Sequence, residues 1–312
     1  MDFVPHTPED DKAMLERIGA ASISELFEPV PEQVRRDEPL DVPESLSEPE
    51  LLDHMGRLAA RSKGVSDLVC FAGGGAYDHH IPPVVKALAS RGEFATSYTP
   101  YQPELSQGVL QALFEFQTLV CEIYGMEVAN ASLYDGANAV VEAVNLAVRT
   151  TGRNRVIVGD TVHPQYVDVL RTYTSGLGLE IVVAPHGEDG TCDWGSIDAS
   201  GSAALVVSYP NVFGRLEDVR TAVKRAHESE ALAIAVTDPT AMGVLASPGE
   251  IGFDVAVGEG HALGNALSFG GPYVGLFATR LQHVRQVPGR IAGETLDVDE
   301  RRAYVLTLQA RE

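Results

Sequence analysis

A loop rich in tyrosine and amide side chains precedes a long helical stretch, and its residue types could bind a small polar ligand. The loop, at residues 97–108, carries two tyrosines, two glutamines and a glutamate, and the candidate pocket residues among them are Tyr98, Tyr101, Gln102 and Glu104. Two prolines fix an extended backbone there, and the free N–H groups of a helix start attract carboxylates and phosphates. The pattern predicts either the aromatic edge of a ligand pocket or a capped helix start with structural tyrosines.

A second group of candidate pocket residues lies at the start of another expected helix, and consists of Ser132, Tyr134 and Asp135. Small residues at a helix N-terminus can surround an anion with free N–H groups. Asp135, however, stands at the expected N-cap, where its carboxylate would accept hydrogen bonds from the same N–H groups. The sequence therefore favours self-capping over phosphate binding at this helix.

Three consecutive glycines at residues 73–75 precede the cluster Asp78-His79-His80. Glycine permits positive φ angles and close approach of the backbone, so a turn or a ligand loop is expected. The phosphate-loop patterns GxxxxGK[ST] and GxGxxG are both absent. Adjacent histidines point in different directions and no further ligand pattern follows, so we predict no metal site.

Two later segments end apolar stretches with residues that could contact a ligand. Asp238 ends an expected strand, where its carboxylate could pair with a pyridinium ring or simply cap a turn. Glycines are dense in residues 258–265 and 268–272, which implies close backbone packing or a ligand loop. The GxSxG motif of serine hydrolases is missing, which argues against a hydrolase.

The elements that must position these segments begin at about residue 66. We expect strands at residues 155–158, 180–183, 204–208, 232–237, 254–257 and 273–278, and helices at residues 104–124, 135–152, 165–173 and 216–228. Continuous apolar strands between helices indicate a mostly parallel sheet that is buried on both faces. This pattern predicts an open, doubly wound α/β domain that binds ligands at the carboxyl ends of its strands.

The N-terminal segment differs from the rest in charge and proline content. Residues 1–50 hold 7 of the 18 prolines, with 14 acidic and 4 basic side chains. Helix-cap patterns occur at Thr7-Pro8, Ser22-x-x-Glu25 and Ser47-x-x-Glu50. We therefore predict a helical arm over residues 1–65, which is too small for its own core and packs on the main domain or on a partner chain. The α/β domain would occupy residues 66–312.

Composition excludes several classes of function. The 312 residues carry a net charge of −21, which disfavours binding to nucleic acid and to anionic membranes. The sequence contains no apolar run of 18 residues, so no membrane-spanning helix is expected. The N-terminus lacks a secretory pattern and the three cysteines are scattered, so a cytoplasmic location is expected. Only four of the 23 basic residues are lysines, which indicates a halophilic protein, the alternative being an ordinary acidic one.

Taken together, six segments resemble one family, the α subunit of the two-subunit glycine dehydrogenase (decarboxylating), which is the P-protein of the glycine cleavage system. The segments are AGGGAYDHHIPP (72–83), SYTPYQPELSQG (97–108), SLYDGANA (132–139), HPQY (163–166), YPNVFGRLED (209–218) and GEGHALGNALSFGGPYVG (258–275). The resemblance implies the fold of the type I pyridoxal-phosphate enzymes. It also implies that glycine is decarboxylated with release of CO2, and that the aminomethyl group passes to the lipoyl arm of the H-protein.

The resemblance also implies how the cofactor is divided between two chains, because the family's β subunit carries the lysine that forms the Schiff base. Here no lysine follows Lys224, and the corresponding position falls near Ala262, beside His261, where the family usually has glutamine. A Schiff base needs a primary amine. Pyridoxal phosphate is therefore expected on the β subunit of an α2β2 assembly, with residues 98–104 of this chain facing it.

Two alternatives remain beside a subunit of a shared active site. A self-sufficient pyridoxal-phosphate decarboxylase or aminotransferase is disfavoured by the missing lysine. A non-catalytic scaffold or regulatory subunit of the same complex is not distinguished by the sequence. The family's chain continues into a small C-terminal domain that is missing here, where the sequence stops at residues 308–312 inside a stretch that reads as a helix.

Overall fold

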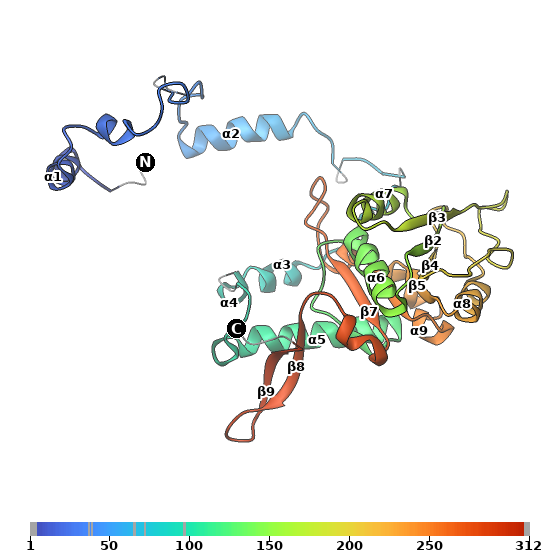
Figure 1. Cartoon of the computed structure of the whole chain (residues 1–312). Coiled ribbons are helices and arrows are strands. Elements are labelled where there is room, and N and C mark those ends of the chain that lie inside the picture. The colour runs from blue at the N-terminus through green and yellow to red at the C-terminus, as the bar shows by residue number, and fades with distance from the viewer. Residues whose placement is uncertain are drawn as a thin grey trace. The chain divides into compact units, whose positions relative to one another are not determined.

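The computed structural model describes residues 5–36, 38, 40–64, 67–71, 73–95 and 98–308. The chain divides into two units, Met1–Leu68 and Val69–Glu312. The first unit contains short helices, namely α1 (Pro8–Ile18), the 3-10 helix η1 (Ile23–Phe27) and α2 (Glu48–Ala59) (Figure 1). None of the residues in these three helices is buried within the chain. The expectation that this arm packs on the main domain or on a partner chain stays a prediction.

The predicted helix caps of the first unit are present, with one difference. Ser47 forms the predicted reciprocal capping box with Glu50, and Thr7, predicted as a cap, forms one with Asp10 as well. Ser22 also caps its helix, but the Glu25 carboxylate accepts a hydrogen bond from the N–H of Ala21 at 2.6 Å. The helix that follows is a 3-10 turn of five residues.

The second unit is built on a seven-stranded sheet with the order β1-β7-β6-β5-β4-β2-β3. Its strands are β1 (Val128–Ala129), β2 (Arg155–Gly159), β3 (Glu180–Ala184), β4 (Ala204–Ser208), β5 (Leu232–Val236), β6 (Val255–Glu259) and β7 (Gly275–Thr279). Strands β2 to β6 pair in parallel, while β7 is antiparallel to β6 and to β1. The six predicted strands are therefore confirmed to within about two residues, and only the short β1 of this sheet lacks a sequence signal.

Helices cover both faces of this sheet (Figure 1). They are α5 (Gln107–Tyr124), α6 (Gly136–Thr151), α7 (Pro164–Thr174), α8 (Val219–Glu228) and α9 (Pro248–Ile251), and the smaller α3 (Pro83–Ala89) and α4 (Gly92–Ala95) precede α5. Side chains alternate along each strand: Val206 of β4 packs with α6 and α7, and Leu205 packs with α5 and α8. Both faces are apolar, which explains why the strands read as continuous apolar runs.

The two long helices begin and end close to their predicted positions. Asp135 caps α6 by accepting a hydrogen bond from the N–H of Asn138 at 2.7 Å, which confirms the predicted self-capping. Helix α5 ends at Gly125, as predicted, but begins at Gln107 instead of residue 104. Residues 103–105 form a separate 3-10 turn, because Ser106 has non-helical backbone angles (φ −126°, ψ 23°) and interrupts the helix.

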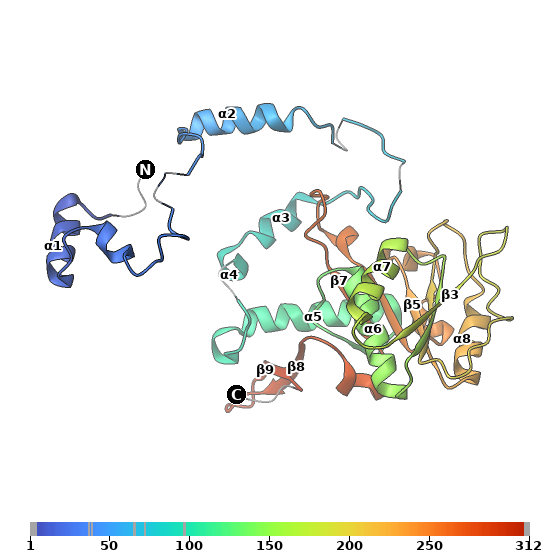
Figure 2. The same cartoon turned by 45° about the horizontal axis from the view of Figure 1, so that its top comes forward.

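A two-stranded hairpin, β8 (Ile291–Leu296) and β9 (Arg302–Thr307), lies along α5 (Figure 2). Residues 308–312 were expected to lie inside a helix, but the preceding residues 302–307 form β9 and Leu308 is not helical, while residues 309–312 lie outside the described residues. Two glutamines of α5 explain the hairpin's position. Gln117 bonds both backbone groups of Ala292, at 3.0 and 2.8 Å, and Gln107 bonds both of Tyr304, at 2.9 and 2.8 Å.

Within the described part of the chain, no helix combines the length and apolar character that crossing a membrane requires.

Candidate functional site

A cavity of about 290 Å³ opens at the carboxyl ends of β4, β5 and β6. This is where a doubly wound sheet is expected to bind ligands. Residues after these three strands line it together with two earlier segments of the chain, and the lining includes Gly75, Tyr77, His163, Tyr166, Asn211, Asp238, Gly258, Glu259, His261 and Ala262. Four of the six segments that carry the family resemblance, and the strand-end carboxylate Asp238, thus meet at one place.

Two histidines form hydrogen bonds with the segment that contains the three consecutive glycines, at the edge of this cavity. Residues 73–75 all have positive φ, between 69° and 85°, which explains why three glycines stand in a row. His163 Nε2 lies 2.9 Å from the carbonyl oxygen of Gly74, and His261 Nε2 lies 3.2 Å from that of Tyr77. In both pairs Nε2 donates to the carbonyl, so these imidazoles position the backbone that borders the cavity.

The carboxylate of Glu259 accepts hydrogen bonds from three backbone N–H groups on three separate segments. Its oxygens lie 2.9 Å from the N of Gly136, 3.0 Å from that of His261 and 2.9 Å from that of Val274. We call these three N–H groups the Glu259 amide site. This role was not predicted from the sequence, where the available signal was an acidic residue between two glycines at the end of a buried strand.

The first turn of α6 therefore carries two carboxylates. Asp135 bonds the N–H of Asn138, and Glu259 bonds the N–H of Gly136. Asp238, at the end of β5, caps its own turn, because one of its oxygens lies 2.8 Å from the N of Thr240 and 2.7 Å from its hydroxyl. The local carboxylates, rather than a bound anion, satisfy these backbone donors.

These residues do not fit pyridoxal phosphate. Ala262 lines the cavity with a methyl group at the position where the resemblance places the Schiff-base lysine. None of the described residues that line the cavity is a lysine or an arginine, and the backbone N–H groups that would suit a phosphate donate to the Glu259 carboxylate instead. A phosphate dianion here would lie against carboxylates in place of cations.

A half-buried phenol, Tyr166, lines this cavity, and a buried one, Tyr124, has its hydroxyl close to the lining residue Gly258. Burial, together with the nearby Glu259 and Asp135 carboxylates, raises the pKa of Tyr166 above its ordinary value. Burial and the Asp238 carboxylate raise the pKa of Tyr124 well above its ordinary value. Both side chains are therefore neutral hydrogen-bond donors at physiological pH, and the site combines neutral donors with carboxylates.

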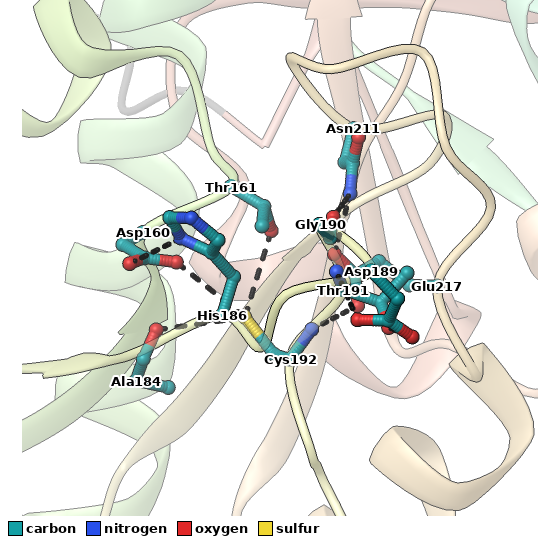
Figure 3. A network of polar contacts seen from close by, with 10 residues as sticks. All are labelled: Asp160, Thr161, Ala184, His186, Asp189, Gly190, Thr191, Cys192, Asn211 and Glu217. Atoms are coloured by element: carbon teal, nitrogen blue, oxygen red, sulfur yellow. Dashed lines mark hydrogen bonds and ion pairs between the residues drawn. The ribbon is translucent and has the colours of Figure 1, made fainter.

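A buried glutamate organises the loop that forms one wall of the cavity. Glu217 is 5% exposed, and it accepts hydrogen bonds from the N–H of Cys192 at 2.9 Å, the indole of Trp194 at 3.0 Å and the side-chain amide of Asn211 at 2.8 Å. Figure 3 shows Glu217 beside Cys192, Asn211 and the turn around Gly190. Glu217 thus fixes Asn211, which lines the cavity.

The neighbouring cysteine is a structural thiol. The sulfur of Cys192 lies 3.8 Å from Asp160, 3.7 Å from Thr161 and 3.5 Å from the carbonyl of Ala184, while His186 bonds the other oxygen of Asp160 at 2.8 Å (Figure 3). Burial raises the pKa of Cys192 to about 11, so the thiolate that nucleophilic chemistry needs is scarce.

No cluster in the described parts of the chain could hold a metal ion.

The predicted loop at residues 98–104 lies outside the lining of the cavity. Tyr98 is 93% exposed, and Gln102 and Glu104 are exposed as well. The Tyr101 hydroxyl lies 3.1 Å from a guanidinium nitrogen of Arg290, whose central carbon is 5.6 Å from the tyrosine ring. This loop presents an open polar and aromatic surface, and its assignment to a shared pocket stays a prediction.

The second predicted group is divided by the fold. Tyr134 is 85% exposed, and Ser132, at a positive φ of 77°, donates its backbone N–H to the side chain of Asn130 at 3.1 Å. Asp135 adjoins the cavity through Gly136 without being among its lining residues. Of the eight positions assigned to the shared site, Ala262 alone lines the cavity. Asp238 and glycines of the segments 73–75 and 258–265, which the sequence indicated as candidate ligand contacts, line it as well.

Comparison with known proteins gives the chain a family. Residues 1–312 match the family model of the glycine cleavage system P-protein. A probable glycine dehydrogenase (decarboxylating) subunit 1 of Desulforamulus reducens is 47% identical over 315 residues, which is 100% of this chain and 70% of the relative. The protein of the same description from Moorella thermoacetica is 49% identical, with the same coverage.

Solved structures agree with this assignment. A crystal structure of a glycine decarboxylase (P-protein) of the glycine cleavage system, in inhibitor-bound form, matches with a TM-score of 0.90 and 49% identity over 100% of this chain and 70% of that one. A Burkholderia pseudomallei sphingosine-1-phosphate lyase, at 14% identity and a TM-score of 0.60 over 90% of this chain and 69% of its own, shares the fold alone. The predicted fold class is confirmed, and the chain belongs to the glycine cleavage system P-protein family.

Proposed function

We propose that this chain is the α subunit of a glycine dehydrogenase (decarboxylating) and acts together with a β subunit. The complex decarboxylates glycine, releases CO2 and transfers the aminomethyl group to the lipoyl arm of the H-protein. The observation that carries the proposal is the match over the whole chain to subunit 1 proteins and to a P-protein structure. Its cavity also has Ala262 where a self-sufficient enzyme of this class needs a primary amine.

We also propose how the two subunits share the active site, and the cavity of this chain supports this proposal. Pyridoxal phosphate, bound by the β subunit, supplies the electron sink for the decarboxylation. This chain contributes residues 98–104 to the pocket that the two subunits share in an α2β2 assembly. The proposal is supported by the absence of lysine and arginine from the described lining residues, and by the exposure of the aromatic loop.

Reconstitution tests this function directly. The assay follows glycine-dependent exchange of CO2 with lipoylated H-protein and pyridoxal phosphate, at high ionic strength because the chain carries a net charge of −21 and salt screens its self-repulsion. We expect activity when this chain and the β subunit are mixed, and none with either alone. Full activity of the β subunit alone would make this chain a scaffold, and activity of this chain alone would contradict the cofactor assignment.

Replacing Tyr101 with alanine is expected to lower kcat/KM of the reconstituted complex about tenfold, which corresponds to about 1.4 kcal/mol of transition-state stabilisation. The side chain is 62% exposed, so the thermal unfolding of the isolated chain should change little. Tyr101→Phe keeps the ring that stacks with Arg290 and should retain more activity. Tyr173→Ala, an exposed tyrosine of α7, is the matched control, and wild-type kinetics of Tyr101→Ala would exclude a role for the loop.

A further inference from the structure

We propose that the Glu259 carboxylate is a built-in anion that occupies the N–H groups of Gly136, His261 and Val274, and that it keeps phosphate-bearing ligands out of this cavity. The ligand class concerned is the phosphomonoester dianion. The inference deepens the proposed function. It rests on that function at one point: there, pyridoxal phosphate is bound by the β subunit, which is why excluding phosphate from this cavity is useful. Phosphate binding by this chain can be measured without any enzymatic activity.

The geometry of the Glu259 amide site is that of an anion site. Its three donors come from the first residue of the 16-residue helix α6, from the turn after β6 and from the residue before β7. All three lie within 3.0 Å of a carboxylate oxygen. Several N–H groups converging from different segments, one of them at a helix N-terminus, attract negative charge.

A second observation points to a ligand-sized polar space beside this site. His261 lines the same cavity and is 4% exposed. Its Nε2 bonds the carbonyl of Tyr77, whereas its buried Nδ1 has no hydrogen-bond partner among the described residues. A buried ring nitrogen without a partner is costly, and a donor group of a bound molecule would satisfy it.

Glu259 excludes a phosphate in two ways. Its oxygens occupy the three N–H groups that a phosphate would need. Its charge, with that of Asp238 on the same cavity, also repels a dianion across a partly buried space, where screening by solvent is weak. Adding a lysine at position 262 would therefore not create a phosphate-binding pocket while Glu259 remains.

The test compares binding of inorganic phosphate, pyridoxal phosphate and pyridoxal to the full chain, by calorimetry and by the shift of the unfolding temperature. Wild type should show no phosphate-dependent stabilisation. Glu259→Ser, which removes the charge and leaves space for an anion, should bind phosphate and pyridoxal phosphate at least about tenfold more tightly than wild type, consistent with the strength of anion binding at helix N-termini. Pyridoxal, which lacks the phosphate, should gain nothing.

Two further variants make the outcome specific to the Glu259 amide site. Asp238→Asn removes one negative charge from the same cavity without freeing these N–H groups, and should therefore gain much less affinity for phosphate than Glu259→Ser. Glu259→Ala frees them without adding a hydroxyl, and should bind phosphate as Glu259→Ser does. Phosphate binding by wild type, or equal gains in Asp238→Asn and Glu259→Ser, would overturn the proposal. The proposal would also be overturned if Glu259→Ser and Glu259→Ala both fold but bind no phosphate, or if both unfold and phosphate does not restore the fold.

Discussion

Replacing Glu217 with alanine is expected to lower the free energy of unfolding by about 3 kcal/mol. The side chain is 5% exposed and accepts hydrogen bonds from three donors on three different residues. A buried donor that loses its acceptor costs about 1 kcal/mol or more, and the truncation also leaves a cavity. The wall of the pocket that contains Asn211 should loosen with it.

Urea unfolding followed by circular dichroism measures this loss, and two variants control for its cause. Glu217→Gln keeps the volume and one accepting oxygen, so its loss should lie between those of wild type and Glu217→Ala. Glu188→Ala removes the same charge from an exposed position of a nearby loop, and should change stability by less than about 0.5 kcal/mol. A loss for Glu217→Ala as small as that of Glu188→Ala would refute the structural role of the buried carboxylate.

Replacing Gly258 with alanine is expected to destabilise the fold by about 3 kcal/mol or more. An added Cβ would lie 1.9 Å from the carbonyl oxygen of Thr237 and 2.7 Å from the hydroxyl of Tyr124. The first of these atoms is backbone at the carboxyl end of β5, which cannot move without disturbing its pairing with β6. We therefore expect a large fall in unfolding temperature and a smaller soluble yield.

The matched control for Gly258 is Gly243, which ends the 3-10 turn after β5. A Cβ there would meet no atom within 4 Å, so Gly243→Ala should change the free energy of unfolding by less than about 1 kcal/mol. Differential scanning fluorimetry of both variants separates close packing from a general cost of added side chains. Equal unfolding temperatures of Gly258→Ala and wild type would show that β5 and β6 can separate to admit a methyl group.

The main elements of the α/β unit were predictable because their signals are local. Strand β4 is a run of five apolar and small residues, and such a run between helices indicates burial on both faces. Asp135 occupies the N-cap of α6 because its side chain reaches an N–H group only three residues away. Gly125 and Gly152 end α5 and α6 in the left-handed conformation that glycine favours.

The elements that the sequence analysis missed lack such signals. The hairpin of β8 and β9 is fixed by Gln107 and Gln117, whose amides bond backbone groups 197 and 175 residues away. A glutamine on a helix has no local feature that distinguishes this role from solvation. The predicted start of α5 at residue 104 was also wrong. Pro103 could not distinguish the two possibilities, because a proline is compatible with the first positions of both an α-helix and a 3-10 turn.

Residue types and their spacing were enough to predict the sheet, the long helices, the family resemblance and the missing lysine near Ala262. The folded chain alone decided that Glu259 and Glu217 are acceptors for converging N–H groups, while residues 98–104 lie outside the cavity. The amino-acid sequence does not show which hydrogen-bond donors a carboxylate will meet. Its role depends on which donors the tertiary structure brings within about 3 Å, and those of Glu259 come from segments up to 123 residues away.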